Sequence, residues 1–299
     1  MNDPVVQTNG LTKTFGSTRA LDGLDLKVPQ GCVYGMLGPN GAGKTTTMRI
    51  LMGLFKADSG SATILGENSW GLSPKTKERI AYLSESQTLF ENWKVFRAVQ
   101  FHSSFFPTWD QDMAERILEK LEIPPKERIK ALSKGKKRGL ALALAVSQRP
   151  ELMLLDEPAG GLDVETRRDF LNTVLDLVAD QTCTVVFSSH ILSDVERVAD
   201  WIGIIKKGRM RIAGQTDDLK TRVKKLRLSA MLNEDAISNM FNIVRLERED
   251  NATLVTADNV APELIERATR EWDCSIETYD LGLEQIYLEY TAKEKELVE

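Results

Sequence analysis

The chain begins with two stretches in which apolar and polar residues alternate, Val5–Thr8 and Ala20–Val28. A period of two places every second side chain on the same face of a strand, so each stretch predicts a strand with one buried face. We expect these strands to be antiparallel and to form a small β subdomain at the N-terminal side of the fold.

The middle of the chain shows a different pattern. Continuous apolar runs at Val33–Leu37, Leu152–Leu155 and Thr184–Ser188 are separated by segments with helical spacing, such as Phe170–Val178 and Ile191–Val198. Runs that are apolar throughout predict strands buried on both faces, and their alternation with helices is typical of a parallel sheet covered by helices. The sequence therefore predicts an α/β core.

Two segments depart from this alternation. Residues 86–130 are rich in aromatic side chains, and Asp110–Leu121 places its apolar residues on one helical face, with Asp110 as the expected N-cap. We predict a helical insertion there. Residues 216–299 combine short strand patterns with helical ones. We therefore divide the chain into a domain of residues 1–215 and a small C-terminal α/β domain of residues 216–299, whose role the sequence does not identify.

Composition narrows the functional classes. The 299 residues include 39 Lys or Arg and 44 Asp or Glu, and 19 of the acidic residues lie in residues 216–299. The basic residues are dispersed, which argues against nucleic-acid binding. The longest apolar stretch, Leu140–Val146, is far too short to cross a bilayer, so a role at a membrane requires a partner protein. The widely spaced Cys32, Cys183 and Cys274 predict reduced thiols in a cytosolic protein, with no zinc site.

A phosphate-binding pattern, G-x-x-x-x-G-K-[ST], occupies Gly38–Thr45, directly after an apolar strand and at the start of a helical segment. Glycines allow backbone N–H groups to converge on phosphates, the helix N-terminus adds partial positive charge, Lys44 neutralises phosphate oxygens and Thr45 can ligate Mg²⁺. The alternative, a glycine-rich turn that binds nothing, fits this context poorly. The residues expected to contact ATP here are Gly38, Pro39, Asn40, Gly41, Ala42, Gly43, Lys44, Thr45 and Thr46.

Two later strands end in polar residues. Asp156 and Glu157 follow Leu152–Leu155, and His190 follows the next apolar run. An acidic pair before a proline is by itself an ordinary surface turn, and a lone histidine is usually a surface residue. With a phosphate loop upstream we interpret Asp156 as a Mg²⁺ ligand, Glu157 as the group that orients or deprotonates the attacking water, and His190 as a hydrogen-bonding partner of phosphate or Glu157.

A second anion site is predicted at Ser133. This serine precedes an apolar helix and is a natural N-cap, so the helix start can bind an anion. Without the phosphate loop, a capped helix with solvated lysines would be the better interpretation of the segment Leu132–Arg138.

In this order, the motifs resemble those of the nucleotide-binding subunits of ATP-binding cassette transporters, and in particular small exporter-type cassettes whose membrane subunits are separate chains. The resemblance spans Val5–Gly214. It implies a P-loop NTPase fold with a parallel sheet, an antiparallel β subdomain and a helical insertion. It further implies that Ser133 and Gly135 belong to the family signature, Asp163 to the D-loop, and Phe15 to the adenine contact.

The sequence departs from the family pattern at two places. Glu85 stands where the family usually has a glutamine that touches Mg²⁺ and the membrane partner, and a carboxylate there could still reach the metal. The signature carries Lys134 and Lys136 but keeps Ser133 and Gly135. The retained serine and glycine leave a phosphate contact possible, and the lysines add positive charge.

The resemblance implies an ATPase that uses Mg²⁺, pairs head to tail with a second cassette in a homodimer or heterodimer, and drives transport, with export favoured, through integral membrane permease subunits. Such a protein would be cytoplasmic and peripheral to the cell membrane, with no nucleic-acid partner. Two alternatives stay open: a soluble assembly ATPase of the same family, and a nucleotide-binding regulatory module with little hydrolysis.

Overall fold

The computed structural model describes residues 3–86, 88–178, 183–249 and 251–292. The chain divides into two compact units, Met1–Met210 and Arg211–Glu299. This division falls within one strand, five residues before the boundary predicted at 215/216.

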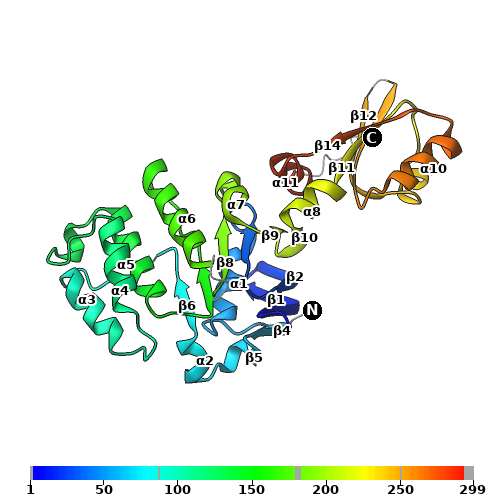
Figure 1. Cartoon of the computed structure of the whole chain (residues 1–299). Helices are drawn as coiled ribbons and strands as arrows, with labels where there is room; N and C mark the ends of the chain where they lie inside the picture. The colour runs from blue at the N-terminus through cyan, green and yellow to red at the C-terminus, as the bar shows by residue number, and fades with distance from the viewer. Residues whose placement is uncertain (1–2, 87, 179–182, 250, 293–299) are drawn as a thin grey trace. The chain divides into compact units, whose positions relative to one another are not determined.

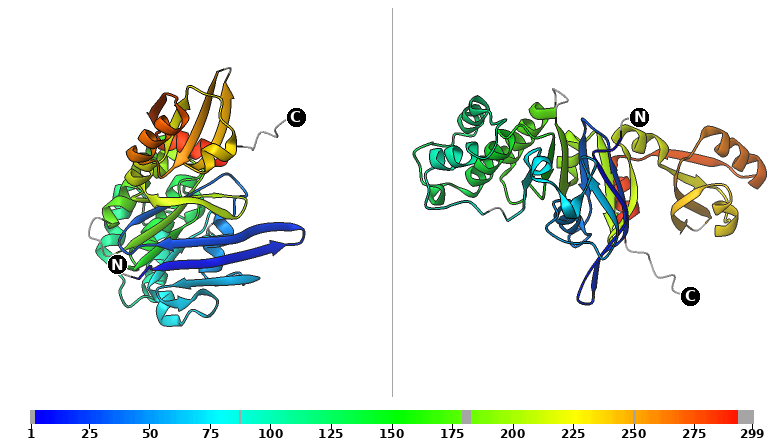
Figure 2. Two further views of the ribbon diagram at one scale, coloured as in Figure 1. Left: turned by 90° about the vertical axis from the view of Figure 1, so that its right-hand side faces the viewer. Right: turned by 90° about the horizontal axis from the view of Figure 1, so that it is seen from below.

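The first sheet of unit 1 is antiparallel, with strand order β2-β1-β4-β5. Its strands are β1 (Val6–Phe15), β2 (Thr18–Val28), β4 (Ser59–Ile64) and β5 (Glu67–Asn68). In β2, Leu24, Leu26 and Val28 are buried while the residues between them are exposed, as the alternation predicted. Figure 2 shows β1 and β2 as a long blue hairpin.

The central sheet of unit 1 has the order β10-β9-β3-β8-β7-β6, and β9, β3, β8, β7 and β6 are mutually parallel. Its strands are β3 (Val33–Leu37), β6 (Ile80–Leu83), β7 (Leu152–Leu155), β8 (Thr184–Ser189), β9 (Trp201–Lys206) and β10 (Arg209–Gln215). Every residue of β3, β7 and β8 is buried, which confirms the strands expected from continuous apolar runs. The fold is the expected α/β class.

Helices pack against this sheet (Figure 1). They are α1 (Lys44–Leu51), α2 (Pro74–Glu78), α5 (Lys134–Val146), α6 (Val164–Val178) and α7 (Leu192–Val198), with short 3₁₀ turns at Ser69–Gly71 and Ile129–Ala131. All residues of α5 from Arg138 to Val146 are buried, so the longest apolar stretch of the chain forms a core helix. In the described part of the chain, no helix has the length and apolar character needed to cross a bilayer.

The helical insertion lies between β6 and β7, and contains α3 (Val95–Ser103) and α4 (Gln111–Lys120). In Figures 1 and 2 it occupies the end of unit 1 that is remote from β1 and β2. Asp110 caps α4 as predicted, since its Oδ1 accepts a hydrogen bond of 2.8 Å from the Met113 N–H. Ala114, Ile117 and Leu118 form the buried face of this helix.

Unit 2 is a four-stranded antiparallel sheet with helices. Its strands and helices follow the chain order β11 (Lys224–Leu228), α9 (Glu234–Ser238), β12 (Asn242–Glu249), β13 (Ala252–Asp258), α10 (Pro262–Trp272) and β14 (Ile276–Asp280), flanked by α8 (Thr216–Arg222) and α11 (Leu283–Thr291). The strand order β12-β13-β11-β14 makes this the βαββαβ arrangement of ferredoxin-like folds. Leu226, Leu228 and Val255 are buried at its centre, with Ile237 of α9 and Ala268 of α10.

The three cysteines are free and buried. Burial raises the pKa of Cys32 and of Cys183 to about 12, so neither thiol is a ready nucleophile. They act as small apolar side chains of the core.

The core of unit 2 makes a stability prediction. Leu226→Ala, which removes a fully buried side chain, is expected to destabilise unit 2 by about 2–5 kcal/mol. Leu288→Ala, at an exposed position of the same unit, is expected to cost far less. Hydrogen–deuterium exchange of peptides from β11 and β13 measures the difference. Equal protection in the two variants would contradict this assignment of the core.

Candidate active site

The phosphate loop connects the buried strand β3 to helix α1. Its backbone needs glycine: Gly41 and Gly43 have φ of 79° and 110°, and a Cβ on Gly38 would lie 2.4 Å from the Ile205 carbonyl oxygen. α1 begins at Lys44 and its first turn has no side-chain cap. Its first N–H groups are therefore available to an anion.

Lys44 turns back into this loop and is only 5% exposed. Its Nζ donates hydrogen bonds to the carbonyls of Gly38 (2.7 Å) and Pro39 (3.3 Å), and lies 3.2 Å from Oε1 of Glu157. A buried ammonium requires such partners, because a buried charge without partners is strongly unfavourable. The geometry leaves Lys44 held by groups of the chain itself, at the place where phosphate oxygens are expected.

Asp156 directly follows β7, and its carboxylate accepts hydrogen bonds from two hydroxyls. Thr45 Oγ1 and Ser188 Oγ both donate to its Oδ1, at 3.0 and 2.8 Å. Its Oδ2 is buried and accepts no hydrogen bond in the structure. Burial raises the pKa of Asp156, whereas the hydrogen bonds from Ser188 and Thr45 lower it. This carboxylate therefore has one satisfied and one unsatisfied oxygen.

Glu157 is fixed by its main chain. It has φ of 46°, in the left-handed region, which costs a non-glycine residue about 1–2 kcal/mol. Its N–H donates to Ser188 Oγ (2.9 Å), and its carbonyl accepts from Arg138 Nη2 (2.9 Å). The carboxylate then spans two partners, with Oε1 near Lys44 and Oε2 2.8 Å from Nδ1 of His190.

His190 follows β8, one strand beyond β7, as the sequence predicted. The structure thus brings together five residues that were predicted from separate motifs: Lys44, Thr45, Asp156, Glu157 and His190. This cluster lies at the carboxyl ends of adjacent parallel strands.

The residues of the predicted signature are held elsewhere. Ser133 caps α5 as expected, since its Oγ accepts from the Lys136 N–H at 3.2 Å. Gly135 packs against Thr166, where a Cβ would come within 3.0 Å of Thr166 Cγ2. Among the described hydrogen bonds and ion pairs, none joins Ser133 or Gly135 to Lys44, Asp156 or Glu157. Within one chain, the described hydrogen bonds and ion pairs therefore do not connect the predicted signature to this cluster.

Asp163 and Phe15 are likewise outside the cluster. Asp163 caps the start of α6, where it accepts hydrogen bonds from the Thr166 N–H (2.9 Å) and hydroxyl (2.7 Å), and these lower its pKa. Phe15 is the last residue of β1, and 43% of its surface is exposed. Its ring and that of Phe55 form an edge-to-face pair with 5.4 Å between the ring centroids. An exposed, supported ring can stack on a planar base.

Two functional candidates escaped the sequence analysis. Ser188 bridges Asp156 and Glu157, and its only signal was its place at the end of an apolar strand. Arg138 is buried at 7% exposure and donates to main-chain carbonyls on both sides of the site. It is hidden in the sequence within a cluster of lysines. Glu85, predicted as a metal ligand, is exposed, and its carbonyl accepts one of those bonds at 2.7 Å.

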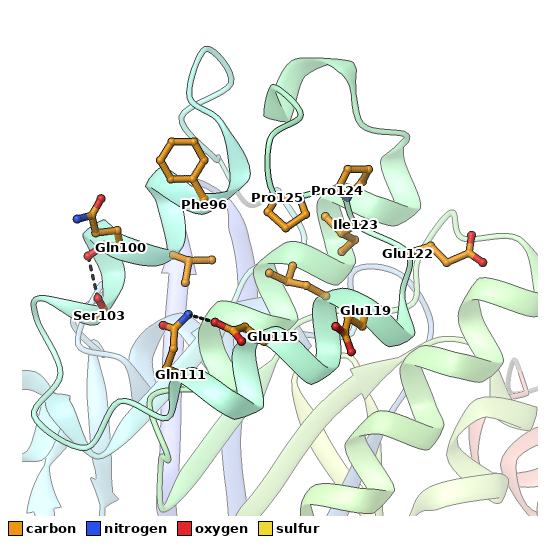
Figure 3. A pocket seen from close by; sticks show the side chains of 12 residues that line it. Phe96, Gln100, Ser103, Gln111, Glu115, Glu119, Glu122, Ile123, Pro124 and Pro125 are labelled. Atoms are coloured by element: carbon orange, nitrogen blue, oxygen red, sulfur yellow. Dashed lines mark hydrogen bonds between the residues drawn. The ribbon is translucent and has the colours of Figure 1, made fainter.

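A cavity lies in the helical insertion (Figure 3). It has a volume of about 630 Å³ and is formed by α3, α4 and the loop that follows α4. Phe96, Val99, Leu118 and Ile123 supply apolar surface. The described residues of its lining include three glutamates, Glu115, Glu119 and Glu122, and no lysine or arginine. We call this cavity the insertion groove.

Comparison with known proteins places these features in context. A family model described as ABC transporter matches residues 21–160. The chain is 34% identical to the bacitracin transport ATP-binding protein BcrA of Bacillus licheniformis, over 74% of this chain and 73% of BcrA. It is 31% identical to the daunorubicin/doxorubicin resistance ATP-binding protein DrrA of Streptomyces peucetius, over 96% of this chain and 92% of DrrA.

Two solved structures share the fold. One is the ATP binding subunit of an ABC transporter, with a TM-score of 0.65 at 24% identity, over 73% of this chain and 92% of that chain. The other is the cassette MJ0796 in a dimeric structure bound to ADP and Pi, with a TM-score of 0.63 at 21% identity, over 70% of this chain and 98% of that chain. These similarities confirm the expected nucleotide-binding fold.

The Ser188 bridge can be tested by its removal. Ser188→Ala leaves the buried N–H of Glu157 without a partner and removes one of the two hydroxyls that donate to Asp156 Oδ1, so we expect a loss of about 1–3 kcal/mol in the free energy of unfolding. Ser147→Ala is a matched control, because this equally buried hydroxyl only donates back to Ala143 within α5. Urea unfolding of the nucleotide-free protein compares the two. A loss in Ser147→Ala as large as in Ser188→Ala would contradict a bridging role.

Proposed function

Since this chain belongs to the ATP-binding cassette transporter family as an ATP-hydrolysing subunit, we propose that the cluster around Glu157 is its hydrolytic site and that it powers export through separate integral membrane subunits. The observation that carries the proposal is the meeting of Lys44, Glu157 and His190 beside the phosphate loop. Export is supported by the names of the similar proteins, which refer to bacitracin transport and to drug resistance.

In this proposal, nucleotide binding rearranges the Lys44–Glu157 pair. The terminal phosphate replaces Glu157 as the partner of Lys44, and the ammonium then neutralises charge on the transferred group. The Glu157 carboxylate becomes free to contact the attacking water. Glu157 orients the water and accepts its proton. His190 holds the other carboxylate oxygen through Nδ1 and so limits the directions that Glu157 can face. Phe15 provides the surface on which adenine stacks.

The chain also fits a Mg²⁺ ion that arrives with ATP. Asp156 offers its buried, unsatisfied Oδ2, and Thr45 offers its hydroxyl 3.0 Å from the other oxygen. In the described residues no group of three His, Cys, Asp or Glu could hold a metal by itself. That agrees with Mg²⁺, which is usually held by one or two carboxylates together with substrate phosphates and water. When bound, the ion would neutralise phosphate charge. Burial is the main cause that raises the pKa of Asp156, and the charges of Glu157 and Glu85 raise it further.

A second cassette would complete the site. The start of α5, with Ser133, Gly135 and Lys134, is separated from the phosphate loop of its own chain, yet it has the features of an anion site: a capped helix N-terminus and added positive charge. Head-to-tail pairing would bring it, together with Asp163, over the ATP held by a second copy or by a related cassette. The fold is shared with a cassette whose structure is dimeric.

The insertion groove is the proposed contact with the membrane subunits. Cytoplasmic loops of membrane proteins carry an excess of lysine and arginine. A groove with an apolar floor and the glutamates Glu115, Glu119 and Glu122 on its rim suits an amphipathic segment of that kind. The protein would then lie at the cytoplasmic face of the membrane through its partner.

The hydrolytic assignment can be tested with Glu157→Gln. The amide keeps the size of the side chain but cannot accept the proton of water, so we expect ATP turnover to fall by about 10²–10⁴-fold while ATP binding is retained. Lys44→Ala should lose binding as well. Glu165→Gln, an exposed position in α6, is the control. Phosphate release and nucleotide binding are measured in parallel, with and without Mg²⁺. Wild-type turnover in both Glu157→Gln and Lys44→Ala would refute the assignment.

The groove can be tested with Phe96→Asp, which places a charge in its apolar lining. We expect the variant to retain about tenfold less of the polytopic membrane protein that co-purifies with the wild type from detergent-extracted native membranes, without loss of ATP binding. Leu54→Asp, at an exposed apolar residue outside the groove, should retain normal amounts. Undiminished retention by Phe96→Asp would exclude the groove as the contact.

A further inference from the structure

A single buried arginine joins three segments around the proposed hydrolytic site. Arg138 lies in the second turn of α5 and is 7% exposed. Its Nη1 donates to the carbonyls of Ser84 (3.0 Å) and Glu85 (2.7 Å), and its Nη2 donates to the carbonyl of Glu157 (2.9 Å). The acceptors follow β6 and β7, two neighbouring parallel strands. The guanidinium therefore connects the helix that starts at the signature with both strand ends.

The chemistry of the guanidinium makes this connection rigid. Its N–H donors lie in one plane, so their directions are fixed relative to one another. It stays protonated in proteins, so all of them remain donors. Burial lowers the pKa of Arg138, while the nearby charges of Glu85, Asp156 and Glu157 raise it. The three carbonyl oxygens supply the partial negative charge that a buried cation needs. Moving one of the three segments therefore strains the bonds to the others.

The link bears on Glu157 in particular. That residue holds a left-handed conformation, with its N–H bound to Ser188 and its carbonyl bound to Arg138. The two bonds fix the peptide groups on both sides of its Cα. The direction of its carboxylate toward Lys44 and His190 depends on that orientation.

We propose that Arg138 is a positioning residue, which makes the placement of the Glu157 carboxylate depend on the loop at Glu85 and on the start of α5. The inference rests on the proposed hydrolytic role of Glu157. In this arrangement, a displacement of the Glu85 loop by a membrane partner, or of α5 by a phosphate at its N-terminus, reaches Glu157 through one side chain. Turnover thereby responds to the occupation of both neighbouring sites.

The experiment compares Arg138→Met and Arg138→Lys with Arg116→Met in the full-length chain. Arg116 is an exposed arginine of α4 and serves as the control for loss of a guanidinium. For Arg138→Met we expect kcat to fall about 10–100-fold, while KM and the Kd for ATP change less than about threefold. Arg138→Lys should recover part of kcat, because an ammonium can reach some of the three carbonyls but cannot span them all.

A second comparison distinguishes positioning from general damage. In the Glu157→Gln background, Arg138→Met should lower the residual turnover no further, because both changes act on the same carboxylate. Additive losses, a matching loss of ATP affinity, or wild-type kcat in Arg138→Met would each overturn the inference. If Arg138→Met does not fold, Arg138→Lys decides alone: a wild-type kcat refutes the role, and a reduced kcat with unchanged Kd supports it. Absence of turnover in the wild-type chain would instead refute the proposed function.

Discussion

The parallel pairing of β3, β7 and β8 is the constraint on which the site depends. In this register Leu37 lies opposite Ser189, and Leu155 lies opposite Phe187, so the three strands end at nearly the same level of the sheet. The phosphate loop, the acidic pair and His190 come directly after these strands and therefore meet at one edge. The residues of the strands are buried on both faces, so a slip in register would disrupt their packing against the covering helices and misplace all three groups at once.

The same edge gathers buried charges that have to be balanced within the chain. Lys44 and Glu157 are each other's counterions at 3.2 Å, and Asp156 is solvated by two hydroxyls. Removing one partner of a buried pair leaves a charge whose desolvation is uncompensated. The Lys44 ammonium is thus satisfied by the carbonyls of its own loop and by Glu157, so each of these buried charges has a partner within the chain.

The sequence predicts those elements whose signal lies in a few neighbouring residues. The strands at 33–37 and 152–155 have the bounds expected, because each is an apolar run ended by glycine or polar residues. The caps Asp110 and Ser133 were also predictable from the few residues around them. In unit 2, by contrast, the patterns did not predict α8, α9 or β14. β14 has four exposed residues out of five, so it carries no apolar alternation, and α8 has only seven residues.

The site residues that escaped prediction act through tertiary contacts. Ser188 is 31 residues from Glu157 along the chain, and Arg138 is 53 residues from Glu85, so neither spacing carries a pattern. Both residues also bind main-chain groups, which every residue type offers. The link from α5 to position 85 therefore does not depend on the side chain there, because Arg138 binds the carbonyl of Glu85. The side chain at this position can therefore change while the main-chain connection to Glu157 is preserved.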